Sequence, residues 1–279
     1  MLKQLYKRYR QNEFRILLGI IYIIALYGLW ISIINGTWWW IIPLCFGISR
    51  FSTIFSNSIA QHRYFTHRSF DTTPFKEKVL AWLTVISCTG SPIQYARNHR
   101  HHHKVADTEK DWHSPHVDGP WHVLFGTWEF RSLSWYIERG GISPRDLIAI
   151  PTVRFIHDNY YLIWYGMLFV AWLIDWNVLA YGLALPTLIT HFDYHGFQNW
   201  SNHVNGTRTY DTPDHSKNNK WLYPFMAGEC WHNNHHAKPW LYDFGIQPHQ
   251  KDWIARFLER YFIVDGPATQ RGKYKSSDL

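Results

Sequence analysis

Eight histidines stand in three groups whose spacing is suited to binding metal ions. His62 and His67 are separated by four residues, and the other two groups both follow the pattern His-x2-His-His. Imidazole is a common metal ligand, so this many imidazoles in fixed groups indicate a site for more than one metal ion. No paired-cysteine motif accompanies them, which argues against a zinc ribbon or an iron–sulfur cluster. The second and third groups are His99, His102 and His103, and His232, His235 and His236.

The spacing also predicts how these side chains are presented. Residues i, i+3 and i+4 share one face of an α-helix, so the second and third groups should each direct three imidazoles the same way. The step of five from His62 to His67 is suited to a helix end that turns into a loop. Histidine-rich surface patches and affinity tags exist, but three separate groups favour a shared site over that alternative.

Apolar segments place these groups in a membrane protein. The 279-residue chain has an aromatic content of 18%, and residues 16–34 form a run without charge that is long enough to span a bilayer. A second apolar stretch follows and no small-residue cleavage site is visible, so a cleaved signal peptide is not expected. Cys45, Cys88 and Cys230 are scattered, which gives no indication of a disulfide framework.

The pattern predicts four spans, at about residues 14–34, 39–61, 160–174 and 178–202. Basic residues cluster near both ends of the chain, which has a net charge of +7, so both termini are expected in the cytoplasm. Because these charges flank spans and form no separate domain, nucleic-acid binding is not expected. All of the histidine groups then face the cytoplasm. We predict one all-α domain over residues 1–279, an integral membrane protein with four transmembrane helices and a cytosolic helical cap formed by residues 62–159 and 203–279.

At these motifs the chain resembles the membrane fatty-acyl desaturase family, in particular its stearoyl-CoA desaturase-like branch. The similarity rests on residues 62–70, 97–104 and 228–236, and on 107–115, where Trp112 replaces a usual proline. The resemblance implies a di-iron site and a further motif, Asn-x3-His, which is Asn199 to His203 here. It implies that His203 is a ninth histidine ligand and that Asn199 holds a metal-bound water. A hydrogen bond within a helix is the alternative role for Asn199.

The chemistry of unactivated C–H bonds is consistent with this metal. Such bonds resist acid–base attack, and nitrogen-ligated iron can use dioxygen, whereas zinc has no redox chemistry. Carboxylates should orient the imidazoles. Glu229, three residues before His232 and therefore on the same helical face, is the first candidate. Asp107 and Asp111 are further candidates, for which solvated loop charge is the alternative.

The resemblance also implies a substrate route. By position, Tyr95, Arg97 and Asn98 would shape the acyl tunnel and contact a thioester head group, although Tyr95 replaces a frequent tryptophan and Arg97 could be a surface charge. Arg50 and Asp193 are predicted at similar membrane depth, where charges are rare and usually paired. We expect them to pair, either lining the tunnel floor or as a structural ion pair.

The expected activity is oxygen-dependent desaturation of a fatty acyl chain carried on CoA, acyl carrier protein or a lipid. Alternatives on the same site are hydroxylation, alkyne formation and oxidative decarboxylation. A histidine-rich metal transporter or sensor is the rival from another class, but it needs ligands along a path through the spans. The sequence holds no ferredoxin, cytochrome or flavin motif. Electrons should therefore come from a separate ferredoxin, rubredoxin or b-type cytochrome, and exposed basic residues would suit an acidic partner.

Overall fold

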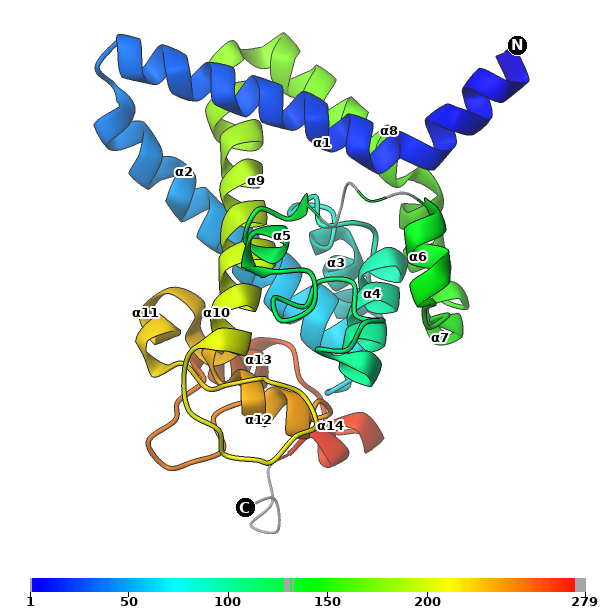
Figure 1. Ribbon diagram of the computed structural model, residues 1–279, viewed down its shortest axis with the longest axis vertical. Helices are drawn as coiled ribbons and strands as arrows, with labels where there is room; N and C mark the ends of the chain where they lie inside the picture. Colours follow the sequence, from blue (N-terminus) through cyan, green and yellow to red (C-terminus); the bar gives the residue numbers. More distant parts are fainter. Residues whose placement is uncertain (1, 128–130, 132, 274–279) are drawn as a thin grey trace.

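The computed structural model describes residues 2–127, 131 and 133–273, and these residues form helices joined by turns and loops (Figure 1). Within these ranges the β-type pairings are isolated bridges, such as Asp71 with Val264, and no strand is formed. The predicted all-α class is therefore confirmed.

Long helices form one end of the molecule (Figure 1). Helix α1 (Leu2–Ile34) is followed by a turn at Gly36, whose φ of +65° is left-handed, and then by α2 (Trp38–Ser52). Helix α2 continues without a break into the π-helix η1 (Thr53–Thr66), which contains His62. Helix α8 (Pro151–Ile174) precedes a second continuous run, made of η3 (Val178–Ala184), α9 (Leu185–Thr190), η4 (His191–Gln198) and α10 (Asn199–Val204).

The helices pack as two neighbouring hairpins. Helix α1 contacts η3 and α9, and α2 contacts α9. The turn after α8 lies beside the C-terminal half of α1, because the rings of Tyr27 and Trp176 are 5.5 Å apart. Both hairpin turns therefore lie at the same end of these helices, and the chain enters the histidine-bearing segments at the other end.

Among the described helices, the stretch Asn12–Ile34 is the one that is long and apolar enough to cross a membrane. The other expected spans are less regular than the sequence suggested. Helix α8 begins at Pro151, before the expected start at residue 160, and its first turns are polar. The last run contains π-helical turns on both sides of α9, where Pro186 lacks an N–H and cannot complete a regular helical bond. Apolar side chains nevertheless project outward, with Ile23, Leu162 and Ile174 exposed by 70%, 71% and 66%.

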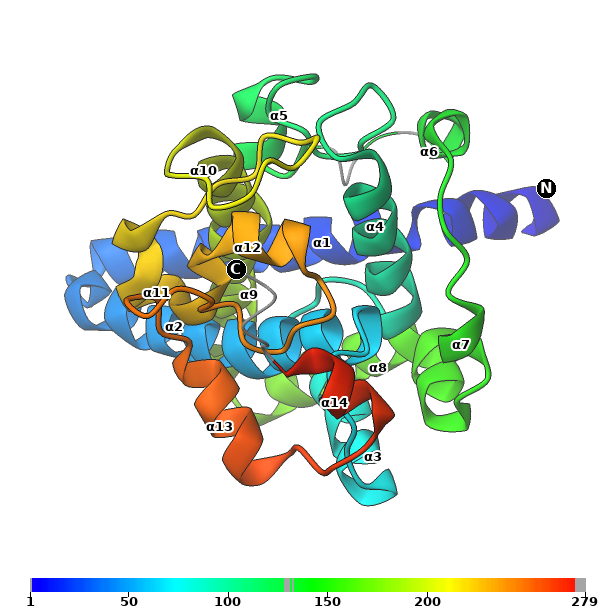
Figure 2. The same cartoon turned by 90° about the horizontal axis from the view of Figure 1, so that it is seen from below.

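Shorter helices form the opposite end, which Figure 2 shows from below. Two of them, α4 (Pro92–Val105) and α12 (His232–Ala237), carry the second and third histidine groups. Helix α4 starts at a capping box in which Ser91 and Gln94 satisfy each other's backbone N–H groups, and Pro92 occupies the first turn. Helix α4 packs against η1, and this contact brings the first two histidine groups together. The remaining short helices are α3 (Pro74–Leu83), α5 (Pro120–Leu124), α6 (Leu133–Arg139), α7 (Arg145–Ile148), η5 (Lys220–Leu222), α11 (Tyr223–Met226), η6 (Ala227–Cys230), α13 (Trp253–Tyr261) and α14 (Pro267–Gly272).

Candidate metal centre

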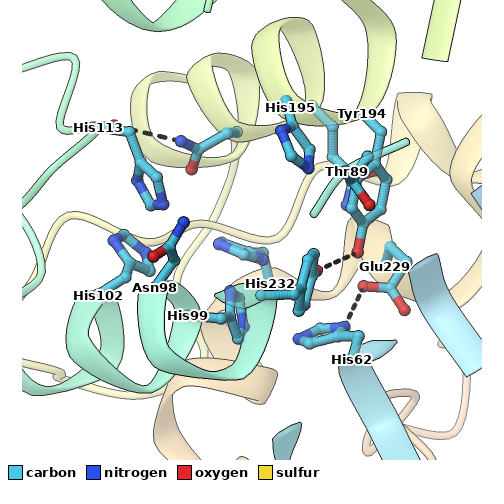
Figure 3. Close-up of a pocket in the computed structure, with 13 residues that line it drawn as sticks. His62, Thr89, Asn98, His99, His102, His113, Tyr194, His195, Glu229 and His232 are labelled. Atoms are coloured by element: carbon cyan, nitrogen blue, oxygen red, sulfur yellow. Dashed lines mark hydrogen bonds and ion pairs between the residues drawn. The ribbon is translucent and has the colours of Figure 1, made fainter. Parts of the chain in front are cut away.

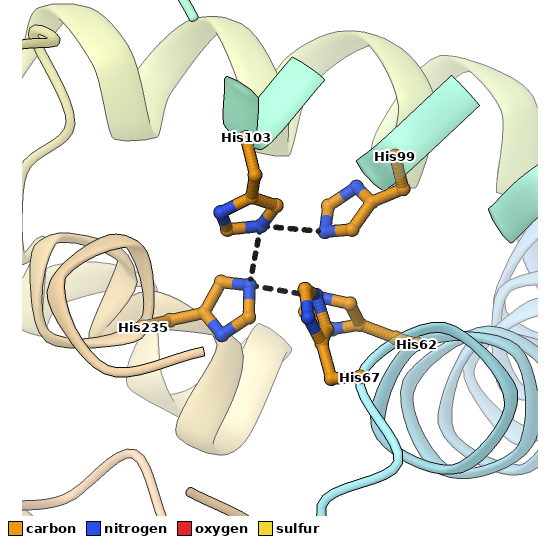
Figure 4. A group of neighbouring side chains, drawn as sticks. All are labelled: His62, His67, His99, His103 and His235. Carbon is orange, nitrogen blue, oxygen red and sulfur yellow. Dashed lines mark hydrogen bonds between the residues drawn. The ribbon is translucent and has the colours of Figure 1, made fainter. Parts of the chain in front are cut away.

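The nine histidines singled out from the sequence lie in two adjacent groups. Within each group the nearest ring nitrogens all lie within 4.8 Å of one another. Figure 4 shows the first group, whose five rings point toward a common centre. The first group is His62, His67, His99, His103 and His235, and the second is His102, His203, His232 and His236.

Helical geometry explains why α4 and α12 each contribute to both groups. Successive residues turn by about 100° around an α-helix, so positions i+4 and i+3 diverge to opposite sides of position i. In α4, His99 and His103 therefore face the first group, while His102 faces the second. In α12 the middle histidine, His235, joins the first group, while His232 and His236 join the second.

The step of five between His62 and His67 is explained by the π-helical end of η1. The N–H of His67 donates to the carbonyl of His62 over 3.1 Å, which is the i to i+5 bond of a π-helix. This bond places both residues on one face, with their ring centroids 5.0 Å apart. The predicted helix end is observed, since η1 ends at Thr66.

The ring nitrogens are arranged as they would be around metal ions. The Nε2 atoms of His62 and His235 are 2.9 Å apart, as are those of His235 and His103, and those of His203 and His232 are 3.2 Å apart. Two nitrogens bound at right angles, each about 2.1 Å from a metal, would be about 3.0 Å apart. The Nε2 atoms of His67, His102 and His236 are buried without a hydrogen-bond partner. Neutral nitrogen donors of this kind fit a transition metal such as iron.

Four carboxylates lie beside the Nδ1 atoms of four of these rings, and the contacts of His102, His203 and His236 have hydrogen-bond geometry. An Nδ1–H that points at a carboxylate leaves Nε2 as the free donor for a metal, so the pairing fixes both tautomer and orientation. Three of the carboxylates were predicted from the sequence, and Asp214 was not. The pairs are Glu229 with His62 at 2.9 Å, Asp111 with His102 at 3.0 Å, Asp107 with His203 at 2.8 Å, and Asp214 with His236 at 2.9 Å.

The pKa values favour ionised carboxylates and, for several of the rings, neutral imidazoles. Burial opposes ionisation of Glu229, but His62 and Arg63 outweigh it and lower the pKa of this carboxyl to about 2. Burial and the neighbouring imidazoles lower the pKa of His99 and His232 well below the usual value. Burial likewise lowers the pKa of His236 to about 4. These rings are therefore neutral near pH 7, which is the form that binds metal. His102 differs, because Asp111 outweighs the effect of burial and raises the pKa of this ring.

Glu229 reaches the site by a different route from the one expected. It lies in the 3-10 helix η6, separate from α12, so it does not share a helical face with His232. Its carboxylate instead contacts His62 in η1 and, 2.5 Å away, the guanidinium of Arg63. Arg63 is fully buried and also pairs with Asp252 at 2.7 Å. No sequence signal distinguished Arg63, because an arginine beside a histidine group also suits a surface.

Asp214 lies in the loop that joins α10 to η5. The same loop supports the second group twice, since the backbone N–H of His215 donates to Asp107 Oδ2 over 2.8 Å. An acidic residue between His203 and His232 was the only available signal for Asp214. Neither helical periodicity nor motif spacing indicates which loop carboxylate will meet a distant imidazole.

A cavity opens beside both groups (Figure 3). Of the residues expected to contact substrate, Tyr95 and Asn98 line it, but Arg97 and Arg50 do not. The guanidinium carbon of Arg97 lies 5.7 Å from the centroid of the Trp112 ring, within the range of a cation–π contact. The residues that line the cavity are His62, Thr89, Tyr95, Asn98, His99, His102, His113, Tyr194, His195, Gln198, Asn199, Glu229 and His232.

Two further predicted residues have defined surroundings. Arg50 forms the expected ion pair with Asp193 and donates to the carbonyl of Phe225 over 3.2 Å. Asn199 lines the cavity and donates from Nδ2 to the carbonyl of His113 over 3.2 Å.

The comparisons with known proteins agree with the site. Residues 62–263 match the family described as Fatty acid desaturase. The chain is 33% identical over 226 residues to Delta-9 acyl-lipid desaturase 2 of Arabidopsis thaliana, with 76% of this chain and 68% of that protein covered. It is 31% identical over 224 residues to Acyl-CoA C20 Delta5-desaturase of Anemone leveillei, covering 77% and 70%.

A third relative is longer than this chain. Probable lipid desaturase ADS3.2, chloroplastic, of Arabidopsis thaliana is 32% identical over 214 residues, which cover 72% of this chain and 56% of that protein. The match therefore spans little more than half of that relative. The chain belongs to the fatty acid desaturase family.

Proposed function

We propose that the protein is an oxygen-dependent membrane desaturase that introduces a double bond into a fatty acyl chain at a di-iron centre. The observation that carries the proposal is the convergence of nine imidazoles from four separate helical segments beside one cavity. Membership of the fatty acid desaturase family supports the same reaction class.

The nine histidines of the two groups would hold two iron ions, five imidazoles on one and four on the other. Bound iron would supply the redox chemistry with dioxygen that removes hydrogen from neighbouring unactivated carbons. Asn199 would hold a water on the second metal, since its Nδ2 is engaged with His113 and its Oδ1 remains to accept. Glu229, Asp107, Asp111 and Asp214 would keep the imidazoles in the ligating tautomer.

The cavity would bind the acyl chain. Tyr95 and Asn98 form part of its wall, and the ring of Tyr95 stacks on His99 with centroids 5.7 Å apart. Arg97 would meet a charged head group outside the cavity. Arg50, paired with Asp193 away from the cavity lining, is proposed to stabilise the helix pair rather than to contact substrate.

We propose that residues 14–34, 39–61, 160–174 and 178–202 span the bilayer within a single domain, with the metal centre and both termini in the cytoplasm. The apolar stretch Asn12–Ile34 and the outward apolar faces of the long helices support this topology. Electrons would come from a separate ferredoxin, rubredoxin or b-type cytochrome. The acyl chain would arrive as a thioester or a lipid.

The test is product analysis in cells that express the full chain. Wild-type protein should produce an unsaturated fatty acid absent from control cells and, when purified after iron supply, contain about two irons per chain. His102→Ala should lose both properties, because His102 faces the second group. The matched control is His249→Ala, which removes an exposed imidazole outside both groups. Hydroxylated or alkynyl products in place of alkenes, or absence of iron, would contradict the proposal.

A further inference from the structure

The wall of the cavity beside the metal groups is made of ring-bearing and polar side chains. Among the thirteen described residues that line it, none has an aliphatic side chain (Figure 3). One side is formed by histidines of the two groups with Glu229 and Asn199. The facing side carries Thr89, Tyr194 and His195, which Figure 3 shows across the cavity from His102.

One hydroxyl proton in this wall has no hydrogen-bond acceptor. The hydroxyl of Thr89 is satisfied, since it donates to Asn57 Oδ1 over 2.7 Å and accepts from Gln61. The hydroxyls of Tyr95 and Tyr194 are 3.1 Å apart and share one hydrogen bond, which uses one of their two protons. The accepting hydroxyl keeps its own proton. Both tyrosines are 7% exposed, so that proton lies at the cavity and away from bulk water.

One amide oxygen in the same wall has no hydrogen-bond donor. Gln198 is 5% exposed, lines the cavity, and its Oε1 atom is buried without a hydrogen-bond partner. A buried acceptor without a partner is unfavourable, so a ligand group that donates a hydrogen bond to it should bind about tenfold more tightly than one that does not. A purely alkyl segment at this place would leave both the tyrosine proton and Gln198 Oε1 unpaired.

We propose that the substrate bears a group that both accepts and donates hydrogen bonds, an amide or a hydroxyl, and that this group sits between the tyrosine pair and Gln198. This inference rests on the proposed function and specifies its substrate class. The ring faces of the two tyrosines would hold the adjoining methylene groups. Because the cavity also contacts His99 and His232, the carbons that react lie close to this polar group.

Two sources supply the same chemistry, namely the amide of a pantetheine carrier and a hydroxyl on the acyl chain. The experiment measures binding to the full-length, iron-loaded protein in detergent. Its three sets of probes are the S-ethyl thioester of palmitic acid, the S-ethyl thioesters of 3-hydroxy- and 12-hydroxypalmitic acid, and palmitoyl-pantetheine. Wild-type protein should bind one of the polar probes about tenfold more tightly than the plain thioester.

Substitutions in the cavity wall test which side chains cause this binding preference. Gln198→Leu removes the unpaired acceptor at similar volume, and Tyr194→Phe removes one hydroxyl while keeping the ring. Each should weaken binding of the preferred polar probe about tenfold and leave the plain thioester unchanged or bound more tightly. Tyr261→Phe deletes a hydroxyl that is half exposed and outside the cavity, and it should behave as wild type. If Tyr194→Phe does not fold, the binding preference of Gln198→Leu tests the inference by itself.

The outcomes separate this inference from the proposed function. Preference for palmitoyl-pantetheine identifies the carrier amide, and preference for a hydroxylated thioester identifies the chain. Equal binding of all probes, failure to bind any, or an unaltered preference in folded Gln198→Leu overturns the inference. Each of those results is compatible with double-bond formation in cells. Conversely, a binding preference that depends on Gln198, in a protein that forms no double bond in cells, would contradict the proposed desaturation and support the polar subsite.

Discussion

Replacing Asp214 with asparagine should weaken metal binding by the second group without disturbing the loop. Asp214 uses its two oxygens for different tasks. Oδ1 accepts from the N–H of Ser216 over 2.9 Å and from the hydroxyl of Thr212 over 2.8 Å, while Oδ2 lies 2.9 Å from Nδ1 of His236. Asparagine can keep the first two bonds, but its NH2 group then faces His236. Nδ1 must become an acceptor, so the proton moves to Nε2 and blocks the nitrogen that would bind metal.

The size of the effect follows from this geometry. Loss of a carboxylate that orients a metal-bound histidine typically costs 10- to 100-fold in metal affinity, or about 1.4 to 2.7 kcal/mol. The first group contains neither Asp214 nor His236, so it should keep its iron. Because the loop retains the Oδ1 hydrogen bonds, the metal-free variant should still fold, although loss of the ionised carboxylate beside His236 should lower its free energy of unfolding.

The assay is iron content per chain after dialysis against graded concentrations of a chelator. Asp214→Asn should fall from about two irons toward one at a chelator concentration 10- to 100-fold below that needed for wild type, and product formation should fall with it. Asp211→Asn is the control, since it removes the same charge from the same loop and Asp211 is fully exposed with a 3.7 Å contact to Arg208. If both variants retain two irons equally, the tautomer argument is wrong.

Three other predictions follow from the same contacts. The pKa of Glu229 is lowered to about 2, so the stability that its ionised form provides is present above the unfolded pKa near 4.5 and is lost as pH falls through 2. In Glu229→Gln, the free energy of unfolding of the metal-free protein should therefore depend less on pH over this range and should be lower by about 3 kcal/mol at pH 7. Gly196→Ala would place a Cβ within van der Waals overlap of the Leu124 carbonyl, so it should destabilise the protein by about 1 to 3 kcal/mol in chemical denaturation, whereas Gly166→Ala, with open space around it, should be neutral or stabilising. Removing iron with a chelator should lower the thermal midpoint, and Fe²⁺ but not Mg²⁺ should restore it, because nitrogen ligands bind the former and Mg²⁺ prefers oxygen; equal recovery with both ions would contradict a nitrogen-ligated site.

Short-range pattern was sufficient for much of the site. The His-x2-His-His spacing predicts which imidazoles share a helix face, because the angle between residues is a local property of the backbone. The division of each set of three imidazoles between two groups was not predicted, because it depends on which helices pack beside α4 and α12. The Arg50–Asp193 pair was also predictable, since helical rise alone places the two charges at similar depth.

Other features depend on packing and carry no local signal. The carboxylate on His62 is Glu229, which comes from a distant 3-10 helix rather than from the face of α12. Asp214 was missed because a loop carboxylate can meet solvent or a buried imidazole with the same neighbouring sequence. The unpaired Oε1 of Gln198 is likewise a property of what surrounds it, since its position in η4 is ordinary.

The sequence by itself determined the donor set, the helical class and the family, because ligand type, periodicity and motif spacing are written in neighbouring residues. Only the tertiary structure decided which histidines form each group, which carboxylate lies beside each ring, and which side chains line the cavity. Those features are set by contacts between segments separated by up to about 170 residues, such as His62 with Glu229, and no local rule fixes how such segments meet.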